Sequence, residues 1–373
     1  MSDFSLILLA AGTSSRFEMG VKKQWLRLDE QPLWLHVVKQ FEALNYFSSI
    51  IVTAHEDELL YMQNHTSSTV VAGGESRQVS LKNALDMVET PFVIVSDIAR
   101  ACVSRSLLDL LIKHKNDADN IVPFLPVHDT TVYQNETIDR NNVKLIQTPQ
   151  LSKTDALKKA LLSNIEYTDE SSAIVANGGS RFFVPGEPQA HKLTRIHDLV
   201  QMPCFVKPSK KTLVGQGFDV HAFEDNKTMV LGGITISDTP YGFKAHSDGD
   251  VAIHALIDAL LGAAGMDDIG TLFPDNDEQY KNIDSKELLK TTVQRIKNVG
   301  FSINNVDLTI MAEQPKIAPH KRNIRFTLAE ILGLEPFHVN VKATTTEKLG
   351  FIGRKEGVAV SAVATLTYFD WTL

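Results

Sequence analysis

The chain has 373 residues, of which 43% are hydrophobic and 22% are charged, as expected for a soluble globular protein. This length exceeds what one hydrophobic core usually supports, so two domains are expected. The formal net charge of −8 argues against a general nucleic-acid binder, although a few clustered cations can still attract an anionic substrate.

Two further features bear on where the protein works. The two cysteines, Cys102 and Cys204, offer neither a disulfide framework nor a paired metal-binding motif, which suits a reducing cytoplasm. The apolar run SLILLAAG follows Asp3 and has no basic segment before it, so we expect a buried strand rather than a signal peptide. No apolar run is long enough to cross a bilayer, and no membrane partner is expected.

In the first half of the chain, apolar β-rich runs alternate with segments of helical periodicity. Strands are expected at 4–9, 49–53, 69–72, 92–96 and 120–124, and helices at 32–44, 76–88, 104–114 and 152–163. This order predicts a doubly wound, mostly parallel sheet that binds ligands at the carboxyl ends of its strands.

The segment MPCFVKPSKK then interrupts the alternation with two prolines and three lysines, which is typical of a linker. We therefore expect one domain over 1–205, a linker over 206–211 and a second domain over 212–373. The second domain has an α/β or α+β pattern. Its strands are expected at 212–220, 229–236, 305–311, 338–343 and 358–368, and its helices at 247–264, 285–299 and 321–332.

A loop of small residues follows the first strand, in LILLAAGTSSRFEMGVKKQWL. Ala10, Ala11 and Gly12 let a ligand approach the backbone N–H groups, and Arg16 and Lys23 bring two cations toward the same strand end. The loop is neither a Walker loop nor a GxGxxG motif. It predicts a phosphorylated ligand, with a plain strand-to-helix turn as the alternative.

Two later strand ends add polar groups to this edge of the sheet. GGESRQVS supplies Gly74, Arg77 and Ser80, and SDIAR supplies Asp97 and Arg100. Taken singly, Ser80 could be an ordinary helix hydroxyl, and Asp97 a helix cap or a structural partner of Arg100. Their convergence at one sheet edge favours a ligand pocket.

The order LLAAGxSxRF, KKQ, GGxxRxxS, SDxAR, DT, QTPQ, TDExSA and K(V/L)T resembles the 2-C-methyl-D-erythritol 4-phosphate cytidylyltransferases over about residues 1–205. The resemblance implies a Rossmann-like nucleotidyltransferase fold. It also implies in-line attack of the substrate's phosphate on the α-phosphorus of CTP, with Mg²⁺-pyrophosphate leaving. Ser15, Ile98 and Ala101 depart from the family's common pattern.

The same resemblance implies roles for individual residues. Ala10, Ala11, Gly12, Gly74 and Ser80 would hold the cytidine part of CTP, and Asp97 would also contact substrate. Arg16 and Lys23 would stabilise charge on the α-phosphate. Thr130 and Arg140 would grip the phosphate of methylerythritol phosphate, and Lys192 would support the transition state.

In the second half, GFDVHAF sets Asp219 and His221 two positions apart on a strand, so both side chains share a face. They form either half of a metal site or an ordinary surface pair. His254, inside the apolar helical run AHSDGDVAIHALIDALLG, offers a third ligand, with a buried core histidine as the alternative. Asp258 lies one helical turn further on and is expected to hold the second nitrogen of this imidazole.

Polar segments flank these residues. Ser247 and Asp250 form a capping-box-like pair at the expected start of the helix, a place where phosphate can also bind, and His246 precedes them. DDIGTLFPDND is typical of a solvated turn. ATTTEKLGFIGRKEG brings Glu347 and Arg354 after a strand, as in a nucleotide-phosphate loop with a metal-binding carboxylate or in a polar surface turn.

GFDVHAF, AHSDGDVxxHAxxDAxLGAA, GDIGxLFPD and VKATTTEKLGFxGRxEG resemble the 2-C-methyl-D-erythritol 2,4-cyclodiphosphate synthases over about residues 211–370. The resemblance implies Zn²⁺ on Asp219, His221 and His254, and a second divalent cation, Mg²⁺ or Mn²⁺, on Glu347. His246 and Thr345 would stabilise the transition state. The remaining substrate contacts would be Ser247, Asp268, Gly270, Phe273, Asp275, Thr344, Glu347, Phe351 and Arg354. Asp267 replaces the glycine of GDIG, which affects only the local turn.

This second resemblance implies intramolecular attack of a 2-phosphate on the β-phosphorus, which expels CMP. It also implies a homo-oligomer built on trimeric C-terminal domains. Because the two reactions are not consecutive, an ATP-dependent kinase of the intervening step is expected as a functional partner. The alternatives are a generic sugar-phosphate nucleotidyltransferase with a zinc-bearing accessory module, and a non-enzymatic scaffold with a structural zinc clasp.

Overall fold

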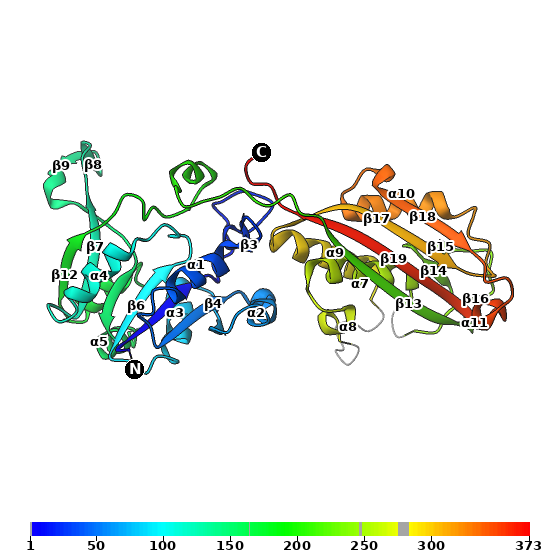
Figure 1. The fold of residues 1–373 in the computed structure, drawn as a ribbon, viewed down its shortest axis with the longest axis horizontal. Coiled ribbons are helices and arrows are strands. Elements are labelled where there is room, and N and C mark those ends of the chain that lie inside the picture. Colours follow the sequence, from blue (N-terminus) through cyan, green and yellow to red (C-terminus); the bar gives the residue numbers. More distant parts are fainter. Residues whose placement is uncertain (1, 164, 246–247, 275–282) are drawn as a thin grey trace. The chain divides into compact units, whose positions relative to one another are not determined.

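The computed structural model describes residues 2–163, 165–245, 248–274 and 283–373. The chain divides into two compact units, Met1–Lys207 and Pro208–Leu373, each with its own sheet (Figure 1). Among the described residues, no helix is both long enough and apolar enough to cross a membrane.

The first unit is built on a mixed, mostly parallel sheet in the order β10-β7-β11-β6-β1-β4-β5, with β12 beside β7. Its strands are β1 (Phe4–Leu9), β4 (Ser49–Ala54), β5 (Thr69–Ala72), β6 (Phe92–Asp97), β7 (Asn120–Pro126), β10 (Lys144–Ile146), β11 (Gln150–Lys153) and β12 (Arg181–Pro185). β1, β4, β5 and β6 run parallel, whereas β11 and β10 pair antiparallel with their neighbours. The predicted doubly wound fold class is confirmed.

Helices cover this sheet and bury its apolar strands. They are α1 (Leu33–Glu42), α2 (Glu56–Gln63), α3 (Arg77–Leu85), α4 (Arg105–Lys113), α5 (Thr154–Ala160) and α6 (Glu170–Ala176). On one face, Leu81, Leu157 and Ile174 of α3, α5 and α6 pack with Ile7 and Val95 of the strands. α2 and α6 were not predicted, because neither segment carries a long apolar stripe at helical spacing.

Short elements complete the unit. β2 (Arg27–Leu28) and β3 (Gln31–Pro32) form a small hairpin, and β8 (Thr131–Tyr133) pairs with β9 (Glu136–Ile138) in another. The turn of the second hairpin has positive φ at Gln134 and Asn135, as in a two-residue turn that suits strand twist. Val132 and Tyr133 are more than half exposed, so this hairpin, which follows β7 (Figure 1), is an arm rather than part of the core.

The second unit has a five-stranded sheet in the order β16-β13-β19-β17-β18. These strands are β13 (Leu213–Asp225), β16 (Tyr241–Phe243), β17 (Phe301–Met311), β18 (Val339–Thr344) and β19 (Gly357–Tyr368). The helices are α7 (Val251–Ala264), α8 (Ile269–Leu272), α9 (Ser285–Asn298), α10 (Lys321–Leu332) and α11 (Gly350–Gly353). The expected strand over 229–236 is instead a hairpin, β14 (Met229–Leu231) and β15 (Ile234–Ile236), because Gly232 and Gly233 turn the chain with positive φ.

α7 lies directly on the backbone of β13 and also packs on β19 (Figure 1). A Cβ added to Gly217 would lie 1.9 Å from the Ala255 carbonyl oxygen, and one added to Gly215 would lie 2.1 Å from that of Ala259. Two glycines therefore allow the close approach. Because side chains alternate along a strand, Asp219 extends from the same face toward the helix.

The start of α7 differs from the expected capping pair. The helix begins at Val251, and the buried carboxylate of Asp250 accepts from the backbone N–H groups of Ala252 and Ile253, 3.1 Å away in both cases. The N-cap is therefore Asp250. Ser247 lies outside the described residues.

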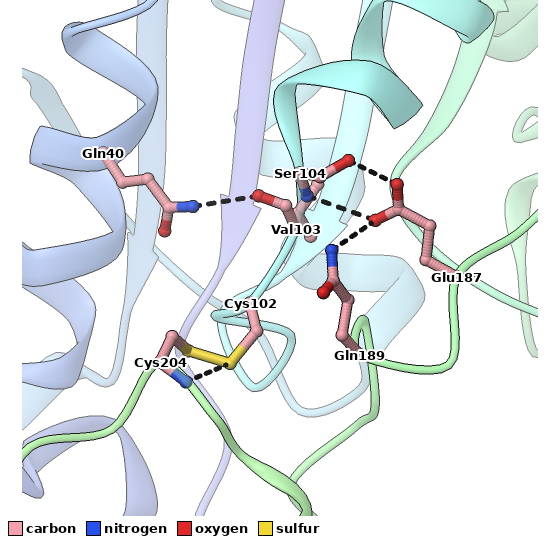
Figure 2. The surroundings of a disulfide bond; sticks show 7 residues. All are labelled: Gln40, Cys102, Val103, Ser104, Glu187, Gln189 and Cys204. Carbon is pink, nitrogen blue, oxygen red and sulfur yellow. Dashed lines mark hydrogen bonds between the residues drawn. A yellow bond between two sulfur atoms is a disulfide. The ribbon is translucent and has the colours of Figure 1, made fainter.

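The expectation of no disulfide is wrong. Cys102 and Cys204 form a disulfide with a Cα–Cα distance of 5.6 Å (Figure 2). Cys102 lies just before Ser104, the N-cap of α4, and Cys204 lies in the segment that leaves the first unit. A separation of 102 residues carries no spacing signal, so only the fold brings the two sulfurs together.

Candidate functional site

The first unit contains a cavity of about 410 Å³ at the carboxyl ends of β1, β4 and β6. Ten of the predicted residues line it: Ala10, Ala11, Gly12, Arg16, Lys23, Gly74, Arg77, Ser80, Asp97 and Lys192. The elements that carry them meet because the parallel strands end at one edge of the sheet. The predicted convergence of these strand ends is thus confirmed.

Four cations line this cavity, Arg16, Lys23, Arg77 and Lys192, and the repulsion between them is unfavourable. Burial is the main cause that lowers the pKa of Lys23 below its ordinary value, followed by repulsion from Lys192, with a smaller contribution from Arg16. The cavity is therefore electropositive and partly desolvated. Such a site favours a ligand with several negative charges.

Asp97 is the anion that holds part of this cluster together. Its carboxylate lies 2.6 Å from Lys192 Nζ and 3.1 Å from Arg77 Nε, and Arg77 also pairs with the buried Glu170 at 2.7 Å. Burial alone would raise the pKa of Asp97, but Arg77 and Lys192 hold it well below its usual range. Arg100 donates to the Ala190 carbonyl, so its charge acts on Asp97 without the direct pairing that Arg77 and Lys192 have.

Ser80 combines a structural role with a place in the cavity. Its hydroxyl donates to the Ser76 carbonyl and accepts from the Gly74 N–H, 3.0 Å away in each case. A Cβ on Gly74 would lie 2.1 Å from Val79 Cγ1, so only glycine fits this turn.

Thr130 and Arg140 do not lie with the other predicted residues. They flank the β8–β9 arm, and Arg140 is exposed, with its guanidinium donating to the His128 carbonyl. Neither residue lines the described cavity of its own chain.

In the second unit, Asp219, His221 and His254 each offer an atom within 4.8 Å of the others. Asp219 Oδ2 lies 3.2 Å from His221 Nε2 and 3.4 Å from His254 Nδ1. One carboxylate and two imidazole nitrogens are donors that zinc prefers, and three protein ligands leave a position open, as in catalytic sites. The set therefore fits a zinc ion.

The expected role of Asp258 is wrong. Its carboxylate accepts from the Ile269 N–H at 2.8 Å and thereby ties α7 to the start of α8. The second nitrogen of His254, Nε2, lies 3.0 Å from Ser285 Oγ instead. Helical spacing correctly placed Asp258 near His254 along the helix, but it carries no information about α9, which brings Ser285.

The DDIG segment is solvated as expected, but it forms a short helix instead of a turn. Asp268 caps α8 by accepting from the Thr271 N–H at 2.8 Å, and Phe273 is buried at its end. Asp267 has φ 58°, a left-handed conformation in which glycine costs less. Gly270 lies within the helix. Asp275 and His246 lie outside the described residues.

The segment after β18 is a tightly held loop. Glu347 and Lys348 both have positive φ, 51° and 67°, and Thr345 Oγ1 donates to Glu347 Oε1 at 3.2 Å. Strain of this kind gathers at functional loops. The rest of the predicted set lies along it: Thr344 ends β18, Phe351 is in α11, and Arg354 forms an ion pair with Glu356.

Comparisons with known proteins match each unit to a family. The family model "2-C-methyl-D-erythritol 4-phosphate cytidylyltransferase" matches residues 4–207, and the YgbB family model matches residues 212–367. A bifunctional enzyme IspD/IspF of Sulfurimonas denitrificans is 58% identical over 99% of this chain and 95% of its own. The chain belongs to the bifunctional IspD/IspF enzymes.

Two more relatives match this chain along nearly the whole length of both proteins. The IspD/IspF enzyme of Aliarcobacter butzleri is 55% identical over 100% of this chain and 99% of its own. The solved structure of bifunctional IspDF from Campylobacter jejuni is 49% identical, with a TM-score of 0.88 and full coverage of both chains. Like other IspD/IspF enzymes, this chain is thus a cytidylyltransferase and a cyclodiphosphate synthase of the methylerythritol phosphate pathway.

Sequence reasoning missed two residues that shape the sites of this IspD/IspF enzyme. Gln24 is 1% exposed; its amide donates to the Gly12 carbonyl at 2.9 Å and accepts from Ser14 Oγ at 3.0 Å. Glu313 accepts from the Lys348 N–H at 3.0 Å and so holds the strained loop. The motif KKQ contained Gln24, but a polar side chain next to two lysines gives no sign of burial.

Proposed function

We propose that residues 1–205 form the domain that transfers the cytidylyl group, residues 206–211 a linker, and residues 212–373 the domain that forms the cyclic diphosphate. The observation that carries this proposal is that each compact unit has its own cluster suited to phosphorus chemistry. The first unit has the cavity with Arg16, Lys23 and Lys192, and the second has the cluster within which Asp219 contacts two histidines.

In the first domain, the phosphate of 2-C-methyl-D-erythritol 4-phosphate attacks the α-phosphorus of CTP. A P–O bond forms there, and the bond to pyrophosphate breaks; Mg²⁺ would accompany the triphosphate and the leaving group. Arg16, Lys23 and Lys192 offset the negative charge that builds up on the α-phosphate. The small side chains of the loop from Ala10 to Gly12 leave the backbone free to contact the cytidine.

In the second domain, Asp219, His221 and His254 would hold Zn²⁺, which when bound supplies a Lewis acid beside the diphosphate. The 2-phosphate of the substrate attacks the β-phosphorus within the same molecule, and CMP leaves. The residues of the chain hold the substrate folded, which removes much of the entropic barrier. We assign Thr345 and His246 to transition-state stabilisation, the latter on the family resemblance alone.

The register of the sheet favours a site that two copies of the chain share. Asp219 lies opposite Val360, which lies opposite Ile310, which lies opposite Ala343 just before the Glu347 loop. Three strand spacings, about 14 Å, separate the two ends of this row. That is too far for two cations that grip one diphosphate, so the Mg²⁺ or Mn²⁺ on Glu347 would come from a neighbouring copy.

An exposed apolar face of the sheet supports such an assembly. Gly215 and Gly217 face α7, so Val214 and Phe218 point to the opposite face of β13, where they are 65% and 56% exposed. We assign this face to a homotrimer contact. Phe218→Asp should then dissociate the assembly in analytical ultracentrifugation, whereas Phe337→Asp, at an exposed site outside this strand, should not.

The β8–β9 arm fits a second contact between copies. Thr130 and Arg140 flank it and do not line the cavity of their own chain, so they would reach the methylerythritol phosphate bound to another copy. A separate ATP-dependent kinase must add the 2-phosphate between the two reactions. We expect this kinase as a functional partner in the cytoplasm, and co-sedimentation of the two proteins tests whether it also binds physically.

Product analysis of paired variants tests the whole proposal. Lys23→Ala should abolish the formation of cytidine diphosphate methylerythritol and leave cyclisation intact, whereas His254→Ala should do the reverse. The activity that each variant keeps reports on the unchanged unit, so calorimetric unfolding of the unit that carries the substitution serves as its folding control. Loss of both activities in either variant, or turnover of glucose 1-phosphate in place of methylerythritol phosphate, would contradict it.

A further inference from the structure

The two histidines of the metal cluster use different ring nitrogens. His221 turns Nε2 toward Asp219, and its Nδ1 lies 2.8 Å from the Gly249 carbonyl oxygen. A carbonyl oxygen only accepts, so in the neutral ring Nδ1 carries the proton and Nε2 presents its lone pair. His254 has the opposite arrangement, with Nδ1 toward Asp219 and Nε2 toward Ser285.

A hydroxyl can donate or accept, so the contact with Ser285 does not by itself fix the proton of His254. The surroundings of Ser285 do. Its side chain is fully buried, and its Oγ donates to Asp248 Oδ1 while its backbone N–H donates to Asp248 Oδ2 at 3.1 Å. An ionised carboxylate accepts only, so the single hydroxyl proton of Ser285 goes to Asp248. Ser285 Oγ must then accept from His254 Nε2–H.

We propose that Ser285 and Asp248 are positioning residues that hold His254 as the Nε2–H tautomer and thereby make Nδ1 its metal-binding nitrogen. This inference rests on the proposed zinc function of the cluster. Ser285 is the first residue of α9, and Asp248 lies just before α7, with Oδ1 accepting also from the Asp250 N–H at 3.2 Å. The pair thus joins the starts of two helices and orients the ring without touching the metal.

The pair has an energetic consequence for metal binding. Without it, the imidazole can turn or place its proton on Nδ1, and both changes must be reversed before zinc binds. Partners of this kind are worth roughly 10–100-fold in metal affinity. Ser285 and Asp248 orient the His254 ring in the zinc-free protein as well as in the zinc-bound enzyme.

The test measures zinc affinity of the full chain by competition with a chromogenic chelator. Ser285→Ala removes the acceptor and should weaken zinc binding roughly 10–100-fold. Ser285→Thr keeps the hydroxyl and should restore most of the affinity. Asp248→Asn keeps the side-chain volume but replaces one carboxylate oxygen with an NH₂ group. When the remaining amide oxygen accepts from the Ser285 N–H, Nδ2 lies against Ser285 Oγ and donates to it. The hydroxyl proton then turns toward His254, and zinc binding should weaken as well.

A matched control lies on the same helix. Thr292 is buried, and its hydroxyl donates to the Leu288 carbonyl at 2.9 Å without contact to the cluster. Thr292→Ala should destabilise α9 and leave zinc affinity unchanged. The calorimetric unfolding transition of the second unit, which contains Asp248, Ser285 and Thr292, reports that each variant is folded.

A second measurement is independent of zinc. Nitrogen-15 NMR of the metal-free chain should find His254 protonated at Nε2, and Ser285→Ala should shift the ring toward a mixture of tautomers. Zinc affinity within about twofold of the parent in both Ser285→Ala and Asp248→Asn, or an Nδ1–H tautomer in the parent, would overturn the positioning role alone. Failure of the parent chain to bind zinc would overturn the zinc function with it.

Discussion

At the scale of single residues, the first site gathers charges that folding alone would keep apart. Arg16, Lys23 and Lys192 repel one another in a partly buried cavity, and Asp97 offsets only part of that repulsion. Arrangements that cost stability and lower a lysine pKa are typical of sites that wait for an anionic ligand. The lowered pKa of Lys23 therefore predicts that ligand binding changes its protonation.

Binding of CTP should be accompanied by proton uptake at alkaline pH. In the free protein, burial and the neighbouring cations lower the pKa of Lys23, so part of this lysine is neutral below its ordinary pKa. The triphosphate favours the charged form and raises that pKa again, so protons are taken up in the interval between the two values. Titration calorimetry at about pH 9 in buffers of different ionisation enthalpy measures the uptake. Lys23→Arg, which stays protonated, should abolish it.

Removal of a buried glutamine side chain should lower stability and CTP binding more than removal of an exposed one. Gln24→Ala leaves the Gly12 carbonyl without its partner and should cost about 1–3 kcal/mol of unfolding free energy. It should also raise the KM for CTP, because Gly12 lines the cavity. Gln63→Ala removes a bond to the Val70 carbonyl at the exposed end of α2 and serves as control. Equal effects of the two variants on KM would contradict the assigned role of Gln24.

Predictability from sequence varied with the kind of contact. Asp219 and His221 could be paired because strand alternation places positions two apart on one face, and the structure has them together. The partner of His254 could not be found, because Ser285 comes from a helix that the motif does not contain. Periodicity describes one element at a time, and contacts between elements depend on how those elements pack.

At the scale of elements, two glycines decide how closely α7 approaches β13. Gly217→Ala would place a Cβ 1.9 Å from the Ala255 carbonyl oxygen, so strand and helix must separate, and the second unit should lose about 3 kcal/mol. Gly262→Ala, inside α7, meets atoms only at 3.9 Å and should stabilise the helix by up to about 1 kcal/mol. Urea unfolding measures both variants. A tolerated Gly217→Ala would mean that this close approach is absent.

The length of an element did not decide how well its bounds were predicted. β1, β5 and α10 have the expected bounds, although β5 has only four residues. The long strand β13 instead continues to Asp225, beyond its expected end at 220. α2 begins with the acidic stretch from Glu56 to Glu58, which gives a helix N-terminus but no apolar stripe. The arm hairpin was missed because three-residue strands are too short for alternation to be recognised.

At the scale of the whole molecule, the change of pattern near residue 205 predicted two units, whereas no local pattern could have predicted the disulfide. Cys102 and Cys204 both belong to Met1–Lys207, and the metal cluster belongs to Pro208–Leu373. The first unit thus carries a covalent constraint, and the second would carry a coordinative one with the proposed metal bound. Reductant and chelator should therefore act on different units.

Calorimetry of the full chain should resolve this separation. A disulfide that closes a loop of about 100 residues contributes up to about 4.7 kcal/mol, so reductant should lower the Tm of the first unit by on the order of 10 °C. A chelator should lower only the transition of the second unit, since the proposed zinc ion would stabilise the state that binds it. Cys102→Ser should reproduce the effect of reductant, and His254→Ala that of the chelator. A reductant that moves the zinc-dependent transition, or two free thiols in the unreduced denatured chain, would refute this assignment.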